Sequence, residues 1–183
     1  MKKVAVFIDN SNIFKTIKKI KESDKKWNTF YDPLKLGKKV AGHNRELVFI
    51  NFYCVKPPVY LLQEDAKHKN KFIVSEKYYS SIEKLPLVNV KYGELKGPKG
   101  ATKEKNVDTQ LATDLITEGA FGKFDVAVII SNDGDYVSAV INVKKFGIKV
   151  ELVSFRGFSS MDLRKNVDVN RRARLSYFEK LIF

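Results

Sequence analysis

Four aspartates stand where a predicted strand ends or a predicted helix begins: Asp9, Asp108, Asp133 and Asp135. The carboxyl ends of the strands in an open α/β sheet share one edge, so carboxylates far apart in the sequence can meet in a single crevice. Carboxylates held close together stay ionised only if a cation compensates their charge, and such oxygen ligands suit Mg²⁺ or Mn²⁺. The placement therefore predicts a divalent-metal site formed by these side chains.

The first of these acids belongs to the segment 7–12, FIDNSN. Asp9 leaves a strand and Asn12 opens a helix, so a carboxylate and an amide can face the same edge of the sheet. A helix cap would explain either residue equally well. Two other functional motifs are excluded: a haloacid-dehalogenase phosphatase requires a second aspartate where Ser11 stands, and an integrin-type metal site requires a serine where Ile13 stands.

The other acids lie in segments 103–108 and 131–136, KEKNVD and SNDGDY. Asp108 falls in the first turn of a predicted helix, where a negative charge is favoured by the helix dipole, and that role alone would account for it. Asp133 and Asp135 flank a glycine at the tip of a buried strand, which aims them over the sheet edge, and capping explains one of them at most. We expect three further polar residues to support the acids without holding the metal: Asp114, which could instead be an exposed charge, Ser131 and Asn132.

The overall charge has the opposite sign, with 34 Lys and Arg residues against 21 Asp and Glu residues and a net charge of +13. A basic protein around an acidic pocket indicates a polyanionic substrate, with nucleic acid as the first expectation. Lysines can also simply solvate exposed helix faces, as the run at 15–21 is expected to do. We expect these residues to contact backbone phosphates: Lys96, Lys99, Lys103, Lys105, Arg171, Arg172 and Arg174.

Hydrophobic periodicity supplies the elements that must position these side chains. Strands are predicted at 4–8, 47–55, 88–92, 126–130 and 148–153. Helices are predicted from Asn12, from Pro33 to a stop at Gly42, over 60–85 as one long or broken helix, around 108–116, over 137–143 before Gly147, and at 161–165. A loop is predicted at 97–100. Alternating strands and helices with short connections imply an α/β fold with a mostly parallel central sheet covered on both faces.

The length of 183 residues fits one domain, 1–183, in which 156–183 forms a C-terminal extension. The apolar tail of this extension could pack on the parent domain or on a partner subunit, and we expect the former because helices commonly close such a sheet. The only cysteine, Cys54, lies in an apolar run and is expected to be a buried thiol in a reducing compartment, which makes the cytoplasm the default location. The apolar run after Met1 ends at Asp9, too early for an export signal, and no segment is long enough to span a membrane.

Taken together, the segments resemble the NYN family, metal-dependent nuclease-like domains related to PIN ribonucleases and often called LabA-like. The resemblance rests on segment 7–12, on Lys105 and Asp108 with the helix that follows through Asp114, and on segment 131–136 before Gly147. It covers about residues 3–155. Asn132 departs from the glycine that commonly precedes the aspartate in this family.

The resemblance implies a three-layer α/β/α sandwich of the PIN-like, Rossmann-like kind, an Mg²⁺ or Mn²⁺ site at the four aspartates, and RNA as substrate. We therefore expect a divalent-metal-dependent endoribonuclease acting on single-stranded RNA, in which Asn12 orients a water or phosphate. Two alternatives remain: an inactive RNA-binding regulatory module of the same fold, and a small-molecule phosphohydrolase. Tyr92 and Tyr136 could stack on unpaired bases or belong to the core. The sequence leaves open whether the chain forms a homo-oligomer.

Overall fold

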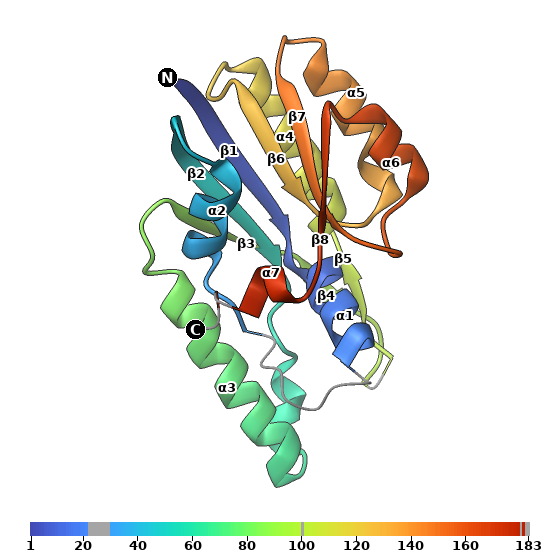
Figure 1. Cartoon of the computed structure of the whole chain (residues 1–183). Helices are drawn as coiled ribbons and strands as arrows, with labels where there is room; N and C mark the ends of the chain where they lie inside the picture. The colour runs from blue at the N-terminus through green and yellow to red at the C-terminus, as the bar shows by residue number, and fades with distance from the viewer. Residues whose placement is uncertain (22–29, 100, 180, 182–183) are drawn as a thin grey trace.

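The computed structural model describes residues 1–21, 30–99, 101–179 and 181, and within them six strands form a central sheet (Figure 1). Every neighbouring pair in this sheet runs parallel, in the order β3-β2-β1-β6-β7-β8. The strands are β1 (Lys2–Asp9), β2 (Arg45–Cys54), β3 (Val88–Tyr92), β6 (Val126–Ile130), β7 (Lys149–Phe155) and β8 (Val169–Ala173). The predicted parallel sheet is confirmed.

Helices cover both faces of the sheet. Successive side chains of β1 point to opposite faces, so each face presents apolar residues that pack in a hydrophobic cluster of its own. On one face Val4, Val6 and Ile8 meet α1 (Asn10–Lys21), α2 (Pro33–Ala41), α3 (Ala66–Ile82) and α7 (Ser176–Glu179). On the other face Ala5 and Phe7 meet α4 (Val107–Ala120), α5 (Val137–Lys144) and α6 (Met161–Asn166). The three-layer α/β/α sandwich is therefore confirmed, and strands with two buried faces explain the continuous apolar runs in the sequence.

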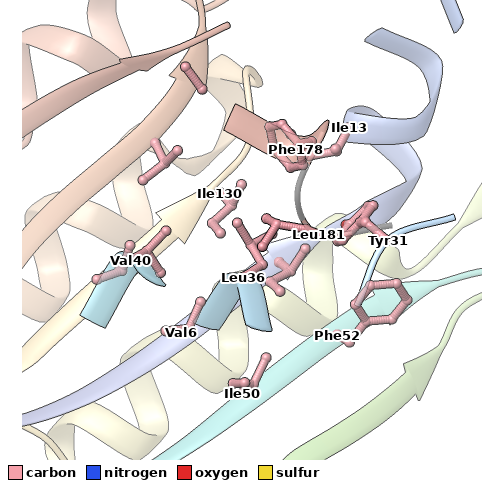
Figure 2. Packing of buried hydrophobic residues seen from close by; sticks show 14 of the residues in the cluster. Val6, Ile13, Tyr31, Leu36, Val40, Ile50, Phe52, Ile130, Phe178 and Leu181 are labelled. Carbon is pink, nitrogen blue, oxygen red and sulfur yellow. The ribbon is translucent and has the colours of Figure 1, made fainter. Parts of the chain in front are cut away.

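The C-terminal tail packs on the first of these faces, as predicted. Figure 2 shows Phe178 and Leu181 close to Tyr31 and Leu36 in the core. The ring of Phe178 lies edge-on to that of Tyr31, with centroids 5.5 Å apart, and the backbone nitrogen of Asp32 donates a hydrogen bond to the carbonyl oxygen of Leu181 at 2.7 Å. The tail thus closes a core that the strands and α2 leave open.

Local signals decide where the helices begin and end. Asp32 caps α2 by accepting hydrogen bonds from two backbone amides, Pro33 occupies the first turn, and Gly42 ends the helix with a φ of 81°. The helix α1 begins at Asn10, two residues before its predicted start, because the side chain of Asp9 accepts a hydrogen bond from the nitrogen of Asn12. The predicted helix 60–85 is broken into the 3₁₀ helix η1 (Val59–Gln63) and α3.

Two segments contain strands that were not predicted. The loop predicted at 97–100 is confirmed over 97–99 as the tip of an antiparallel hairpin, whose strands β4 (Glu94–Lys96) and β5 (Lys103–Lys105) were missed; Gly100 itself is outside the described residues. The basic cluster at 171–174 lies largely within the edge strand β8. Both segments are rich in Lys or Arg and lack the alternation of apolar and polar residues that predicts a strand. Their strand structure depends on pairing with a neighbouring strand, which the local sequence does not indicate.

Cys54 is buried at the end of β2, as predicted, and burial raises the pKa of its thiol above the ordinary range. Among the helices that are described, none combines the length and the apolar character needed to cross a bilayer.

The strand order creates a switch point between β1 and β6. From β1 the chain builds outward through β2 and β3, then returns to the other side of β1 to add β6, β7 and β8. The register pairs Ile8 with Ile130, so the next residues, Asp9 at the end of β1 and Ser131 just after β6, lie side by side at the carboxyl edge of the sheet. In open α/β sheets a crevice forms at the carboxyl ends of strands at such a point, which makes this edge the place to look for a site.

Candidate metal and nucleic-acid site

A cleft of about 870 Å³ opens at this edge of the sheet. Its walls come from α1, the loop after β2, η1, α3, the β4–β5 hairpin and the start of α4. Asp9, Asp108 and Asp133 all line it, although they come from the end of β1, the first turn of α4 and the loop after β6. The fold therefore brings three of the four predicted aspartates to one cavity.

Asp9 is almost completely buried, with 1% of its surface exposed. Its Oδ1 accepts the capping hydrogen bond from the nitrogen of Asn12 at 3.0 Å, and its Oδ2 accepts from the hydroxyls of Ser131 at 2.9 Å and Tyr136 at 3.0 Å. Burial raises the pKa of Asp9 to about 6, the three hydrogen bonds oppose that rise, and the charge of Asp108 adds to it. A nearby cation would favour the ionised form.

Tyr136 connects two of the acids. Its hydroxyl oxygen lies 3.0 Å from Oδ2 of Asp9 and 3.0 Å from Oδ1 of Asp108, and its single hydrogen serves one carboxylate at a time. Burial and the two negative charges raise the pKa of Tyr136 far above its ordinary value, so the phenol stays neutral. Its side chain is fully buried, so of the two roles left open by the sequence the structure supports the core position.

Asp133 and Asp135 are separated by the local backbone. Asp133 begins the 3₁₀ helix η2 (Gly134–Tyr136), where its Oδ1 accepts a hydrogen bond from the nitrogen of Asp135 at 3.1 Å. The hydroxyl of Ser131 in turn accepts from the nitrogen of Asp133 at 3.1 Å. Asp135 is exposed and is not among the residues that line the cleft. The structure thus places Asp133 in the cleft and Asp135 outside it.

Hydrogen bonds between Asn12 and Asn132 link α1 to the loop after β6. Oδ1 of Asn12 accepts hydrogen bonds from the backbone nitrogen of Asn132 at 3.1 Å and from its Nδ2 at 3.0 Å. The same Nδ2 also donates to the hydroxyl of Thr16 at 2.9 Å, and Oδ1 of Asn132 accepts from the nitrogen of Phe155 at 2.7 Å. Within the described residues, the oxygen of Asn12 is engaged and its amide nitrogen has no hydrogen-bond partner, so it can meet a ligand in the cleft.

Asp114 takes part in a different polar group. Its Oδ2 accepts a hydrogen bond from the hydroxyl of Tyr53 at 2.8 Å and lies 3.7 Å from Nζ of Lys91. The hydroxyl of Tyr53 also accepts from Nδ2 of Asn51 at 3.2 Å. These contacts hold α4 against β2 and β3, and Asp114 is not among the residues of the cleft.

The donors in the cleft suit a hard divalent cation in chemical type. In the part of the chain that the structure describes, no group of three or more histidine, cysteine or acidic side chains is drawn together closely enough to hold a metal ion. The three cleft aspartates nevertheless offer only oxygen ligands, as Mg²⁺ and Mn²⁺ prefer. The buried charge of Asp9 beside that of Asp108 is also the kind of imbalance that a cation offsets.

Lysines dominate the rest of the charged lining. Among the described lining residues Glu104 is the one further acid, and its Oε2 lies 2.6 Å from Nζ of Lys15. Of the basic residues predicted to bind phosphate, the cleft contains Lys103. The lysines at 15–21 were predicted to form a solvated helix face, and nothing in the sequence indicated that Lys56 or Lys71 would bind phosphate. Their proximity to the acids depends on the fold. The cleft lysines are Lys15, Lys18, Lys56, Lys71 and Lys103.

The other basic residues predicted to bind phosphate are placed outside the cleft. Lys96 lies 2.9 Å from Glu94, and Lys99 lies 2.6 Å from Glu64. Arg171 contacts the buried carboxylate of Glu151 and donates to the carbonyl oxygen of Val40 at 2.7 Å, so it supports the core. Three are exposed at the surface: Lys105 on β5, Arg172 on β8 and Arg174 just after β8.

Comparison with known proteins identifies the family. Residues 3–171, nearly the whole chain, match the NYN domain. A crystal structure of a protein of unknown function from Vibrio parahaemolyticus RIMD 2210633 superposes with a TM-score of 0.65, at 16% sequence identity, over 100% of this chain and 96% of that one. That likeness concerns the fold alone, and the curated proteins contain no match. The chain therefore belongs to the NYN domain family, within the PIN-like nuclease superfamily.

Proposed function

We propose that the chain is a divalent-metal-dependent endoribonuclease that hydrolyses RNA phosphodiester bonds in this cleft. One observation carries the proposal: Asp9, Asp108 and Asp133, from three distant segments, line a single cavity in which the other charged residues are mostly lysines. Carboxylates that can bind a cation, with lysines around them, suit a polyanionic substrate that reacts at the bound cation. Membership of the NYN domain family supports the same class of chemistry.

Each group in the cleft has a defined task in this proposal. Asp9, Asp108 and Asp133 would hold Mg²⁺ or Mn²⁺, which when bound supplies a Lewis acid for the phosphate and lowers the pKa of an attacking water. The hydroxyl of Tyr136 lies between the carboxylates of Asp9 and Asp108 and positions them by donating to one at a time. The amide nitrogen of Asn12 can donate to a phosphate oxygen.

The lysines bind and orient the strand. Lys15 and Lys18 lie one turn apart on α1, Lys71 lies on α3 and Lys103 on β5, so phosphates can be held from more than one wall of the cleft. Such contacts fix the position of a nucleic acid without reading its sequence. Exposed lysines make this binding depend strongly on salt, because each phosphate that is neutralised releases counterions.

The test is a cleavage assay with labelled single-stranded RNA, single-stranded DNA and a generic phosphomonoester, each with Mn²⁺, Mg²⁺ or EDTA. We expect RNA cleavage with a divalent cation and none with EDTA, and loss of cleavage in Asp133→Asn with RNA binding retained. Asp162→Asn is the matched control, because Asp162 is exposed on α6 away from the cleft. Metal-independent cleavage, or full activity of Asp133→Asn, would contradict the proposal.

One observation favours a second candidate, an RNA-binding regulatory module without turnover. Asp135 lies outside the cleft, which leaves three of the four expected carboxylates inside it. Binding of RNA without cleavage in the same assay would support this module. Turnover of the phosphomonoester alone would support a small-molecule phosphohydrolase instead.

A further inference from the structure

In the part of the chain that the structure describes, Phe14 does not take part in the core that α1 helps to form. On this helix Ile13 and Ile17 are buried against the sheet, whereas Phe14 is half-buried and absent from both hydrophobic clusters of the described residues. It lines the cleft together with Lys15 and Lys18, and Lys18, four residues on, lies on the same side of the helix. The helical periodicity alone would assign Phe14 to the core face.

Tyr60 is placed in a similar way on another wall of the cleft. It belongs to η1, is half-buried, lines the cleft and is likewise absent from the hydrophobic clusters. Nζ of Lys99 lies 5.7 Å from the centre of its ring. The other aromatic rings among the described residues of the cleft, those of Phe30 and Tyr79, do pack against the core, so core packing already accounts for them.

A flat ring that faces a lysine-rich cavity suits one kind of ligand. Every nucleobase has a π-face that can stack on an aromatic side chain, and stacking of this kind tolerates any sequence. Bases paired in a duplex are stacked on each other and do not present these faces, so the rings favour an unpaired strand. Lysines of the same cleft supply charge for the phosphates between the bases: Lys18, one turn from Phe14 on α1, and Lys71 on α3.

We propose that Phe14 and Tyr60 form a base-stacking subsite that selects single-stranded nucleic acid over duplex without reading its sequence. The inference rests on the proposed function in taking nucleic acid as the ligand, but it does not require turnover. It assigns to the cleft two chemically distinct parts, one of carboxylates that meets the scissile phosphate and one of aromatic rings and lysines that holds the flanking nucleotides.

Fluorescence anisotropy with EDTA present, so that no metal-dependent cleavage occurs, tests the subsite. The probes are a short single-stranded RNA, the same strand in duplex form, and a strand of equal length that lacks its bases. We expect wild-type protein to bind the first more tightly than the other two. Phe14→Ala and Tyr60→Ala should each weaken binding of the base-bearing strand by roughly five- to a hundredfold, in keeping with stacking on one base, and leave the abasic strand unaffected.

Two variants make the result specific to the ring. Phe14→Trp keeps an aromatic face and should retain binding, whereas Phe14→Leu keeps an apolar side chain of similar size and should behave like the alanine variant. Phe121→Ala is the matched control, because Phe121 is 74% exposed after α4 and is not among the cleft residues. Phe14→Leu also answers the question if the alanine variant fails to fold.

The outcomes separate this inference from the proposed function. Equal losses on the base-bearing and abasic strands, unchanged binding by Phe14→Leu and Tyr60→Ala, or no binding of single strands by the wild-type protein would overturn the subsite. Base-dependent binding without cleavage in Mn²⁺ would overturn the nuclease and support the subsite. Cleavage with base-independent binding would support the nuclease and overturn the subsite.

Discussion

Asp9 and Asp108 lie on different elements, yet a carboxylate oxygen of each is 3.0 Å from the same hydroxyl oxygen, that of Tyr136. Asp9 ends β1 and Asp108 lies in the first turn of α4. Two acids that share one donor cannot both be satisfied by it, and the charge of Asp108 contributes to the raised pKa of Asp9. This shared contact is the structural basis for treating the two acids as one unit.

Tyr136→Phe should impair catalysis more than folding. The substitution keeps a fully buried ring and removes only the hydroxyl, so the free energy of unfolding should change by no more than about 1 to 2 kcal/mol. The carboxylates of Asp9 and Asp108 lose the donor that positions them, so the rate of RNA cleavage should fall at least about tenfold while RNA affinity stays the same. Cleavage and anisotropy measured on one preparation check this, and a normal rate would argue against the positioning role.

Asp9→Asn should stabilise the protein at neutral pH when no divalent cation is present. Because the folded-state pKa of Asp9 is about 6, above the ordinary 3.8, the folded chain holds the proton more tightly, and this contribution to stability is lost as pH rises through 6. Above that pH the variant avoids a buried charge, and we expect it to gain roughly 1 to 3 kcal/mol in unfolding free energy.

Added Mn²⁺ should reverse the order of the two proteins. A cation that binds only the folded state raises the melting temperature of the wild type, and Asp9→Asn should lose that response. Thermal unfolding at several pH values with EDTA or Mn²⁺ gives both results. A variant less stable than wild type in EDTA at neutral pH would show that the charge of Asp9 is already compensated by the protein.

Asn132→Gly should destabilise the fold, although glycine is the residue that the family resemblance leads one to expect there. The change removes the side-chain hydrogen bonds to Asn12 and Thr16 and leaves the buried nitrogen of Phe155 without its acceptor. We expect a loss of roughly 2 to 4 kcal/mol in denaturant unfolding. Asn142→Ala is the control, because Asn142 is half-buried on α5 and its side-chain hydrogen bonds to Ser138 and Lys145 are exposed, so it should change stability little.

Lys103→Ala and Lys96→Ala should differ although both residues lie on the same hairpin. Lys103 lines the cleft, whereas Lys96 is paired with Glu94 outside it. For single-stranded RNA the slope of log affinity against log salt should become shallower by about 0.7 in Lys103→Ala, since one phosphate contact is lost, and should stay unchanged in Lys96→Ala. Equal slopes for the two variants would remove the hairpin wall from the proposed binding surface.

Arg171→Ala should act on stability rather than on RNA binding. Glu151 is 1% exposed and lies between Arg45 and Arg171, so removing one partner leaves its buried charge less compensated. Unfolding free energy should fall by roughly 1 to 3 kcal/mol. Arg172→Ala, on the same strand but exposed, should have little effect on stability, and an equally large loss there would contradict the distinction.

Much of the fold could be predicted from the sequence, because buried parallel strands and capped helices leave local signals. The apolar run 126–130 is β6 with the predicted bounds, and Asp32, Pro33 and Gly42 mark α2 correctly. The hairpin of β4 and β5 and the edge strand β8 were missed, since charged strands gain their structure from pairing with distant neighbours.

The candidate site was predictable in type and less so in detail. Strand ends mark Asp9 and Asp133, and the parallel sheet brings them to one edge, where the helix start at Asp108 joins them. Which acid of the Asp133–Asp135 pair enters the cleft depends on the turn of η2, and the shared hydroxyl of Tyr136 depends on packing between α4 and the loop after β6. Neither is visible in residue spacing.

An anomalous difference map from crystals grown in Mn²⁺ tests the central claim most directly. The proposed function predicts a peak in the cleft in contact with the carboxylates of Asp9, Asp108 and Asp133, and its disappearance in Asp133→Asn. A map without a peak there at saturating Mn²⁺, or with the ion bound only elsewhere, would contradict the account.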